Sequence, residues 1–308
     1  PPAGATPALS RGAAVVASLA AGACAGAVAK TAIAPLDRTK IRFQTSAKPY
    51  SFRAALKFIL GTVRTEGPLA LWRGNSATMA RIVPYAAVQF AAHEQWKRLL
   101  GHPHIDGANN PTSAHPLLHL TAGSLAGVTS QSATYPLDLA RARMAVTAAD
   151  QYRSLASVFG KVVRYEGFRT LYRGYPATVL GVIPYAGVSF FTYDSLKHKY
   201  LDVHGAPPHG LTNVLFGGAA GALGQTASYP LDIVRRRMQT AARRADGRYP
   251  YATTARTLRE IYRTEGWRGF FKGLSMNWVK GPIAVGISFA TYDYFKVALR
   301  DLAVRLQT

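Results

Sequence analysis

Six stretches of this chain are almost free of charged residues. Three of them contain no Asp, Glu, Lys or Arg, and each of the other three contains a single basic residue. Each stretch approaches the roughly 20 residues that a helix needs to cross a bilayer. Their small residues, repeated at four-residue spacing, would let helices pack closely in lipid. The pattern therefore predicts an all-α membrane protein with six transmembrane helices, near residues 12–34, 76–99, 117–143, 176–200, 211–238 and 275–302.

A shorter amphipathic segment lies between the two long stretches of each third of the chain. From Phe52 to Thr65, apolar residues recur at helical spacing with basic residues between them. A helix of this kind lies along a membrane surface. Similar segments at 153–165 and 253–264 bring the prediction to three short amphipathic surface helices. We expect them on one side of the membrane, and both termini on the other.

A motif of a proline, a carboxylate and two basic residues marks each third of the chain. It has the form Pro-x-Asp-x2-basic-x-basic and begins at Pro35, Pro136 and Pro230, which lie 101 and 94 residues apart. This period indicates three tandem repeats in the 308-residue chain. Because proline interrupts the helical hydrogen-bond ladder, we expect a kink at Pro35. The repeats, called units one, two and three below, are placed at residues 1–102, 103–203 and 204–308.

Two further patterns follow the motif in every unit. Glu-Gly-x4-aromatic-basic-Gly spans residues 66–74, 166–174 and 265–273. A second proline comes next, and then an acid with a base three residues later. These pairs are Glu94 and Lys97, Asp194 and Lys197, and Asp293 and Lys296.

Composition taken alone suggests a different class of protein. Lys and Arg number 37 against 15 Asp and Glu, and the net charge of +22 would suit a nucleic-acid binder. Such a protein needs basic residues interleaved with stacking aromatics on one face, and no such module is visible. An enzyme is also disfavoured, because none of the eight His residues has partners spaced for catalysis or metal binding. We expect no cofactor, no metal and no covalent chemistry.

The triplicated motif and the Glu-Gly pattern resemble the mitochondrial carrier family over essentially the whole chain. The resemblance implies six helices with pseudo-three-fold symmetry around a central cavity, in a multi-pass protein of the inner mitochondrial membrane. It also implies a monomer without nucleic acid, and cardiolipin as a lipid partner at the matrix side. Within the family, residues 34–40, 73–79, 141–147 and 276–282 are most similar to those of carriers for coenzyme A.

The family's pattern assigns the motif charges to a gate at the matrix side. Each carboxylate would pair with a basic residue of another unit, and the expected pairs are Asp37 with Arg141, Asp138 with Arg235, and Asp232 with Lys40. The family places a bracing glutamine beside each pair. This chain has Gln44 and Gln239, but Ala145 in unit two. Charges in a low-dielectric region are costly unless paired, so such a ring closes its side only when assembled.

The second set of acids and bases would form a gate at the cytosolic side. Its members are Glu94, Lys97, Asp194, Lys197, Asp293 and Lys296. Tyr193 and Tyr292 precede the acid in two units and brace this gate in the family, whereas unit one has His93. Substrate binding between the two gates would have to compensate for breaking one of them, which gives alternating access.

Three basic residues stand alone within their uncharged stretches: Lys30, Arg81 and Lys280. We expect them to face a water-filled cavity, where they would favour a polyanion such as a phosphate group. The alternative is that they reach the membrane surface or pair with another helix.

The resemblance also points to contacts with an adenine ring. In the family's adenine-nucleotide members, a glycine and an aliphatic residue on the fourth helix contact adenine, and Gly181 and Val182 match that pair. Tyr185 either offers its ring to the base or only packs near the adjacent proline. Ser228 and Asn277 are expected as polar contacts.

The function implied is antiport of coenzyme A and dephospho-coenzyme A against ADP or adenosine 3′,5′-bisphosphate. The alternative is an ADP/ATP or ATP-Mg/phosphate carrier. Residues 235–240 depart from the run of three Arg and three Met that marks the ADP/ATP carrier. No calcium-binding loop of EF-hand form supports the ATP-Mg/phosphate carrier.

Overall fold

The computed structural model describes residues 11–100, 116–148, 150–243, 247 and 249–305, and within this part the regular structure is entirely helical. Each unit supplies long helices, one short helix and a short 3-10 turn. In chain order the helices are α1 (Arg11–Ala32), α2 (Ala34–Thr45), α3 (Phe52–Glu66), α4 (Asn75–Leu99), α5 (Pro116–Val146), α6 (Leu155–Glu166), α7 (Tyr175–His204), α8 (Gly210–Thr240), α9 (Thr254–Glu265) and α10 (Leu274–Arg305). The predicted all-α class is thereby confirmed.

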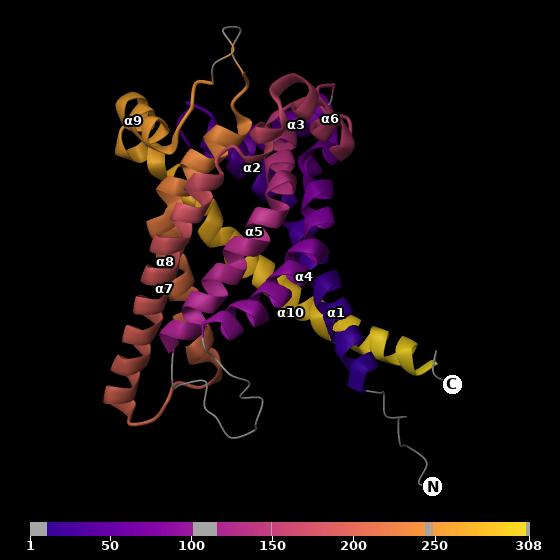
Figure 1. Ribbon diagram of the computed structural model, residues 1–308, viewed down its shortest axis with the longest axis vertical. Coiled ribbons are helices and arrows are strands. Elements are labelled where there is room, and N and C mark those ends of the chain that lie inside the picture. Colours follow the sequence, from indigo (N-terminus) through magenta and orange to yellow (C-terminus); the bar gives the residue numbers. More distant parts are fainter. Residues whose placement is uncertain (1–10, 101–115, 149, 244–246, 248, 306–308) are drawn as a thin grey trace.

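The long helices form a closed ring. α1 packs against α10, α4 against α5 and α7 against α8, so the most extensive helix contacts join different units. Contacts of α1 with α4, α5 with α7 and α8 with α10 complete the ring. Figure 1 shows α3, α6 and α9 gathered at one end, while α7, α8, α1 and α10 extend away from it.

The three motif prolines affect their helices differently. In unit one the helix is interrupted at Ile33, between α1 and α2, as expected for a kink near Pro35. α5 and α8 continue through Pro136 and Pro230 without a break. The residue before each proline differs in the same way. In units two and three it is a fully buried tyrosine whose hydroxyl donates to a backbone carbonyl of the following loop, whereas unit one has alanine there.

Each surface helix begins with a side-chain cap. A side-chain hydroxyl accepts a backbone N–H at the start of each: Ser51, Ser154 and Thr253.

Gly74 and Gly174 immediately precede α4 and α7 and have φ of 87° and 82°. A Cβ atom on either would lie 2.9 Å from the carbonyl oxygen of Arg141 or Arg235. Glycine at these positions therefore lets one unit approach the motif helix of another.

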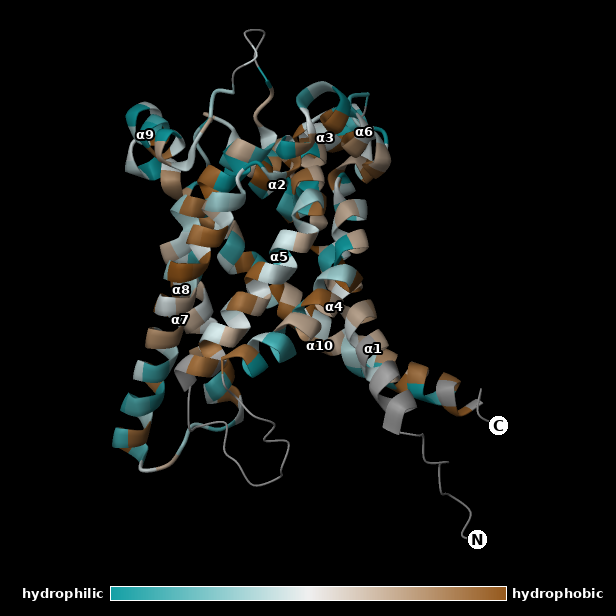
Figure 2. Ribbon diagram, in the orientation of Figure 1, coloured by the Kyte–Doolittle hydropathy of each residue, from teal (hydrophilic) through white to brown (hydrophobic). Residues whose placement is uncertain are grey.

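Many apolar side chains of the long helices are exposed. Figure 2 shows hydrophobic residues along the middle of α7 and α8 and hydrophilic residues toward their ends. Phe191 on α7 and Leu211 on α8 are 73% and 74% exposed. By length and hydropathy alone, one helical segment of the described part, Phe168–His204, is apolar enough to cross a membrane.

Candidate functional site

The three motif carboxylates lie close together where α2, α5 and α8 meet, and each contacts a basic residue of another unit. The contacts are Asp37 with Arg141, Asp138 with Arg235 at 2.6 Å, and Asp232 with Lys40 at 3.1 Å. These are the pairs expected from the family's pattern. They join all three units in one cluster, which we call the motif ring.

Asp138 has the most partners in the motif ring. Its side chain is 1% exposed and also contacts Arg236 at 3.2 Å and Arg81 at 3.4 Å. Gln239 donates to it from Nε2 at 2.7 Å. Because a buried carboxylate is stable as an anion only when it is paired and hydrogen-bonded, this site depends on several partners together.

The other two carboxylates have fewer partners. Asp232 accepts a hydrogen bond from Nε2 of Gln44 at 2.9 Å. Asp37 has a second cation, Lys280, at 2.6 Å. The glutamines at positions 44 and 239 thus lie beside their carboxylates as expected, and Ala145 offers no amide at the third position.

A second layer of ion pairs ties the motif helices to the surface helices. Within each unit an arginine contacts the glutamate of the Glu-Gly pattern: Arg38 with Glu66 at 3.0 Å, Arg143 with Glu166 at 2.5 Å, and Arg237 with Glu265 at 2.6 Å. The Nε of each arginine also donates to a backbone carbonyl of another unit, on Ala145, Gln239 and Gln44 respectively. Each arginine therefore links two units.

Unit one uses a different motif position for this link. Arg143 and Arg237 are the last basic residues of their motifs, but the corresponding Arg42 is exposed. Arg38, four residues earlier and therefore on the same helix face, takes its place. The sequence pattern did not predict this exchange.

Two glutamates of the second layer, Glu166 and Glu265, favour their charged form. Burial alone would raise the pKa of Glu166, but hydrogen bonding and charge from Arg143 lower it overall. The pKa of Glu265 is lowered in the same way, by Arg237 and Lys272 against the effect of burial.

The second set of acids and bases forms no ion pair between units within the described residues. Glu94 contacts Lys97 of the same helix at 3.1 Å, and Asp194 contacts His198 of the same helix at 3.5 Å. The hydroxyl of Tyr193 donates to Asn213 at 3.3 Å. The Nζ of Lys296 lies 5.8 Å from the ring centre of Tyr292. This end of the ring is therefore not closed by charge pairs.

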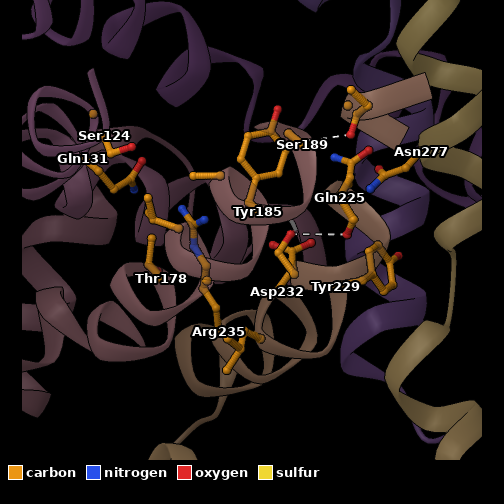
Figure 3. A pocket seen from close by; sticks show the side chains of 18 of the residues that line it. Ser124, Gln131, Thr178, Tyr185, Ser189, Gln225, Tyr229, Asp232, Arg235 and Asn277 are labelled. Atoms are coloured by element: carbon orange, nitrogen blue, oxygen red, sulfur yellow. Dashed lines mark hydrogen bonds between the residues drawn. The ribbon is translucent and has the colours of Figure 1, made fainter. Parts of the chain in front are cut away.

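A cavity of about 860 Å³ extends inward to the motif ring. Six of the expected substrate residues line it: Gly181, Val182, Tyr185, Ser228, Asn277 and Lys280. In Figure 3, Ser124 and Gln131 lie on one side, Gln225 and Asn277 on the other, and Tyr185 between them. Lys40, Arg235, Arg236 and Lys280 make the lining next to the motif ring basic.

Arg81 is not free in the cavity as expected. It lies outside the lining, and its guanidinium is bound to α5 through Gln131 at 2.7 Å and Thr134 at 3.1 Å, in addition to Asp138. Lys280 likewise contacts Asp37 while lining the cavity. Both residues therefore pair with another helix, which was the alternative to a free position in the cavity. Lys30 is exposed, lies outside the cavity lining, and has no ion pair within the described part of the chain.

The cavity residues that the sequence analysis did not single out include Gln131 and Gln225. Both stand five residues before the motif proline, at the register that Lys30 occupies in unit one. A comparison of the three units at equal distance from the proline would have found them.

Comparison with known proteins gives a consistent relationship over more than nine-tenths of the chain. The family described as "Mitochondrial carrier protein" matches three times, at residues 12–104, 112–204 and 207–302. The chain is 57% identical over 291 residues to the human protein named mitochondrial coenzyme A transporter SLC25A42, covering 94% of this chain and 89% of that protein. The zebrafish (Danio rerio) protein of the same name is 54% identical over 94% of this chain and 89% of its own. A maize (Zea mays) mitochondrial carrier protein named CoAc2 is 37% identical over 92% of this chain and 87% of its own.

Proposed function

Because the chain belongs to the mitochondrial carrier family, we propose that it is an antiporter of the inner mitochondrial membrane that exchanges coenzyme A for adenine nucleotides. The observation that carries this proposal is the cavity itself. It ends at a ring of ion pairs joining the three units, and its lining there is basic. It transports rather than transforms its substrate, and it needs no cofactor.

The six long helical segments cross the membrane. Their lengths fit a bilayer, and bulky apolar side chains such as Phe90, Phe191 and Phe289 are 65%, 73% and 67% exposed on the outside of the ring. Exposed apolar surface of this extent is unfavourable in water and favourable in lipid. The protein works as a monomer, because one chain closes the ring and encloses the cavity. Cardiolipin at the matrix side is the lipid partner that the family resemblance implies.

The cavity binds a nucleotide by its two chemically different parts. Gly181, Val182 and Tyr185 offer space and a ring to adenine, and Ser228 and Asn277 offer polar contacts. Asn277 lines the cavity, and its buried amide nitrogen has no hydrogen-bond partner among the described residues, so a small rotation of the side chain would offer this donor to a ligand. Lys30, Arg81 and Lys280 attract the phosphates. Coenzyme A, dephospho-coenzyme A, ADP and adenosine 3′,5′-bisphosphate share these parts.

The motif ring is the closed gate in this conformation, and the second set of acids and bases is the open one. Substrate contacts with Arg81 and Lys280 compete with Asp138 and Asp37, so binding weakens the motif ring from within. The gate formed by Glu94, Asp194, Asp293 and their lysines then assembles as the motif ring opens. Each ring is stable only when its charges are paired, and this couples the two movements.

Uptake by liposomes that contain the purified protein tests this function. We expect external radiolabelled coenzyme A to enter when the liposomes contain ADP or adenosine 3′,5′-bisphosphate, and to enter much less when they are empty. Fast exchange of ADP for ATP without uptake of coenzyme A would favour the alternative, an ADP/ATP carrier. Phosphate-dependent uptake of ATP-Mg would favour an ATP-Mg/phosphate carrier.

A further inference from the structure

The acceptors that hold Arg81 form a row along one face of α5. Gln131, Thr134 and Asp138 are separated by three and four residues, the spacing of neighbours on a helix face. They accept hydrogen bonds from Nη2 at 2.7 Å, Nε at 3.1 Å and Nη1 at 3.4 Å. The guanidinium carbon of Arg81 lies over the ring of Tyr85, 4.7 Å from the centre of that ring. The shortest of these contacts is to the amide of Gln131, so this amide does most to set the orientation of Arg81.

Gln131 also has a donor that the protein does not use. Arginine can only donate, so the amide oxygen of Gln131 must face Arg81 and the amide nitrogen must turn elsewhere. This nitrogen is buried and has no hydrogen-bond partner in the described part of the chain, although the side chain lines the cavity. A buried donor without an acceptor is unfavourable, and a ligand in the cavity would satisfy it.

Asp138 does not need Arg81 to remain paired. Arg235 contacts it at 2.6 Å and Gln239 at 2.7 Å, both closer than Nη1 of Arg81. Nη1 can therefore exchange the carboxylate for a phosphate oxygen while Gln131 and Thr134 keep the rest of the guanidinium in place. Such a phosphate would then lie between Nη1 of Arg81 and the unused nitrogen of Gln131.

The chain contains a matched row without an arginine. On α8, Gln225, Ser228 and Asp232 have the same spacing and the same register to the motif proline. On α7, Gly181 stands three residues before its proline, as Arg81 does on α4. Gln225 lines the same cavity. Because Gly181 stands where unit one has Arg81, Gln225 has no equivalent arginine as a hydrogen-bond donor.

We propose that Gln131 is a positioning residue for anion binding: it fixes the guanidinium of Arg81 and adds its own N–H to the same phosphate group. The inference rests on the proposed function and names a further residue of that site. It predicts that the contribution of Gln131 depends on Arg81, whereas that of Gln225 does not.

The test is coenzyme A exchange in liposomes with Gln131→Met, Arg81→Lys and the double variant, and with Gln225→Met in the same two backgrounds. Methionine keeps the length of glutamine and removes its hydrogen bonds. We expect Gln131→Met to raise the KM for coenzyme A about tenfold with a smaller change in the maximal rate, because charge-assisted hydrogen bonds are lost. In the Arg81→Lys background the same change should alter the KM less than about twofold, since coupled residues are not additive.

Two controls separate positioning from general damage. Gln225→Met should change the KM by the same factor in both backgrounds. Thermal unfolding of Gln131→Met should show one cooperative transition well above the assay temperature, so that loss of the hydrogen bond to Arg81 does not unfold the protein. Gln131→Glu keeps an acceptor for Arg81 but removes the N–H, and we expect its KM to rise as well.

The outcomes distinguish failure of the proposed transport function from failure of the role proposed for Gln131. If the wild type takes up no coenzyme A, the proposed function is wrong and the inference with it. If the wild type is active but Gln131→Met raises the KM equally in both backgrounds, or not at all, the positioning role alone is wrong. A Gln131→Glu variant with the KM of the wild type would contradict the role of the free N–H.

Discussion

Arg236 places its Nη1 3.2 Å from Oδ2 of Asp138, the same oxygen that Arg235 approaches at 2.6 Å. Arg236 also donates to Oε1 of Gln239 at 2.9 Å and lies 4.0 Å from Asp232, so one side chain connects two carboxylates of the motif ring. At the equivalent positions units one and two have Ile41 and Ala142. The motif ring is therefore reinforced on one side only.

Replacing Arg236 by alanine tests this reinforcement. We expect Arg236→Ala to lower the stability of the conformation with the closed motif ring by about 1 kcal/mol, because Asp138 keeps its other partners. Thermal unfolding in detergent measures the effect, with Arg42→Ala as the control, since Arg42 is exposed and lies on the same type of helix. Equal stability of the two variants would show that Arg236 adds nothing to the ring.

Charge swaps test whether the ion pairs of the motif ring hold the gate closed. Single reversals at Asp138 or Asp232 should strongly impair exchange, because each leaves like charges facing one another in a partly buried site. Rescue by the opposite reversal should differ between the pairs. Swapping Lys40 and Asp232 should restore more transport than swapping Arg235 and Asp138, since a base at 138 would still face Arg81 and Arg236.

The measurement is the initial rate of exchange in liposomes for both single and both double variants. A single reversal that leaves exchange intact would mean that the ring is not a working gate. Equal rescue in the two double variants would mean that the additional cations around Asp138 do not matter.

Much of the fold could be predicted from the sequence because exclusion of charge and a repeated motif are long-range patterns. The expected helix near 76–99 is α4 (Asn75–Leu99), and the amphipathic segment from Phe52 to Thr65 is α3 (Phe52–Glu66). The continuous course of α5 through Pro136 was not predictable in this way. The residue before this proline, Tyr135, makes a tertiary contact that no local pattern shows, its hydroxyl donating to the carbonyl of Arg173 at 2.7 Å.

The site was less accessible to sequence reasoning because side-chain pairing depends on neighbouring helices. Arg81 and Lys280 were expected to be free because each is alone in its own stretch. Their partners, Asp138 and Asp37, come from other units. The use of Arg38 in place of Arg42 was hidden for a similar reason, because residues four apart share a helix face and a motif cannot distinguish them.

Two glycines separate the effects of cavity space and helix packing. A Cβ at Gly181 would lie 3.6 Å from the Cβ of Leu231, an ordinary contact, whereas a Cβ at Gly224 would lie 2.8 Å from the carbonyl oxygen of Tyr185. We expect Gly181→Leu to reduce transport of every adenine substrate while thermal stability stays nearly unchanged. Gly224→Ala should instead lower stability by about 1–3 kcal/mol, because α7 and α8 must move apart.

Thermal unfolding and exchange assays on the same preparations compare the two glycines. If Gly181→Leu loses stability as Gly224→Ala does, the position serves packing and not the space for adenine.

Acidification should weaken the link between α5 and α6. The pKa of Glu166 is lowered from its ordinary value of 4.5 by Arg143, against the effect of burial. A lowered pKa means that the folded protein favours the charged form, so this stabilisation is present above about pH 4.5 and is lost as the pH falls through the folded value. The unfolding temperature should therefore fall less between pH 6 and pH 3 in Glu166→Gln than in the wild type. Parallel pH profiles would show that Glu166 does not contribute.

The three expected phosphate-binding cations differ in how far the protein itself uses them. Lys280 contacts Asp37 at 2.6 Å, but Lys30 has no ion pair within the described residues. Lys30→Ala should therefore raise the KM for anionic substrates and leave the unfolding temperature unchanged. Lys280→Ala should raise the KM and also lower the unfolding temperature, because Asp37 then depends on Arg141 alone. Equal stability of the two variants would contradict this distinction.

Substrates that differ by one phosphate group show which cation reads the 3′-phosphate of coenzyme A. Dephospho-coenzyme A lacks that group and keeps the diphosphate, so a cation that binds the 3′-phosphate matters only for coenzyme A. We expect Lys280→Ala to reduce uptake of coenzyme A several-fold more than uptake of dephospho-coenzyme A, and the difference to shrink as salt screens the remaining charges. Equal losses for the two substrates would mean that Lys280 does not read the 3′-phosphate. Because weakening of the motif ring affects both substrates alike, the ratio of the two losses reports on phosphate binding and not on the gate.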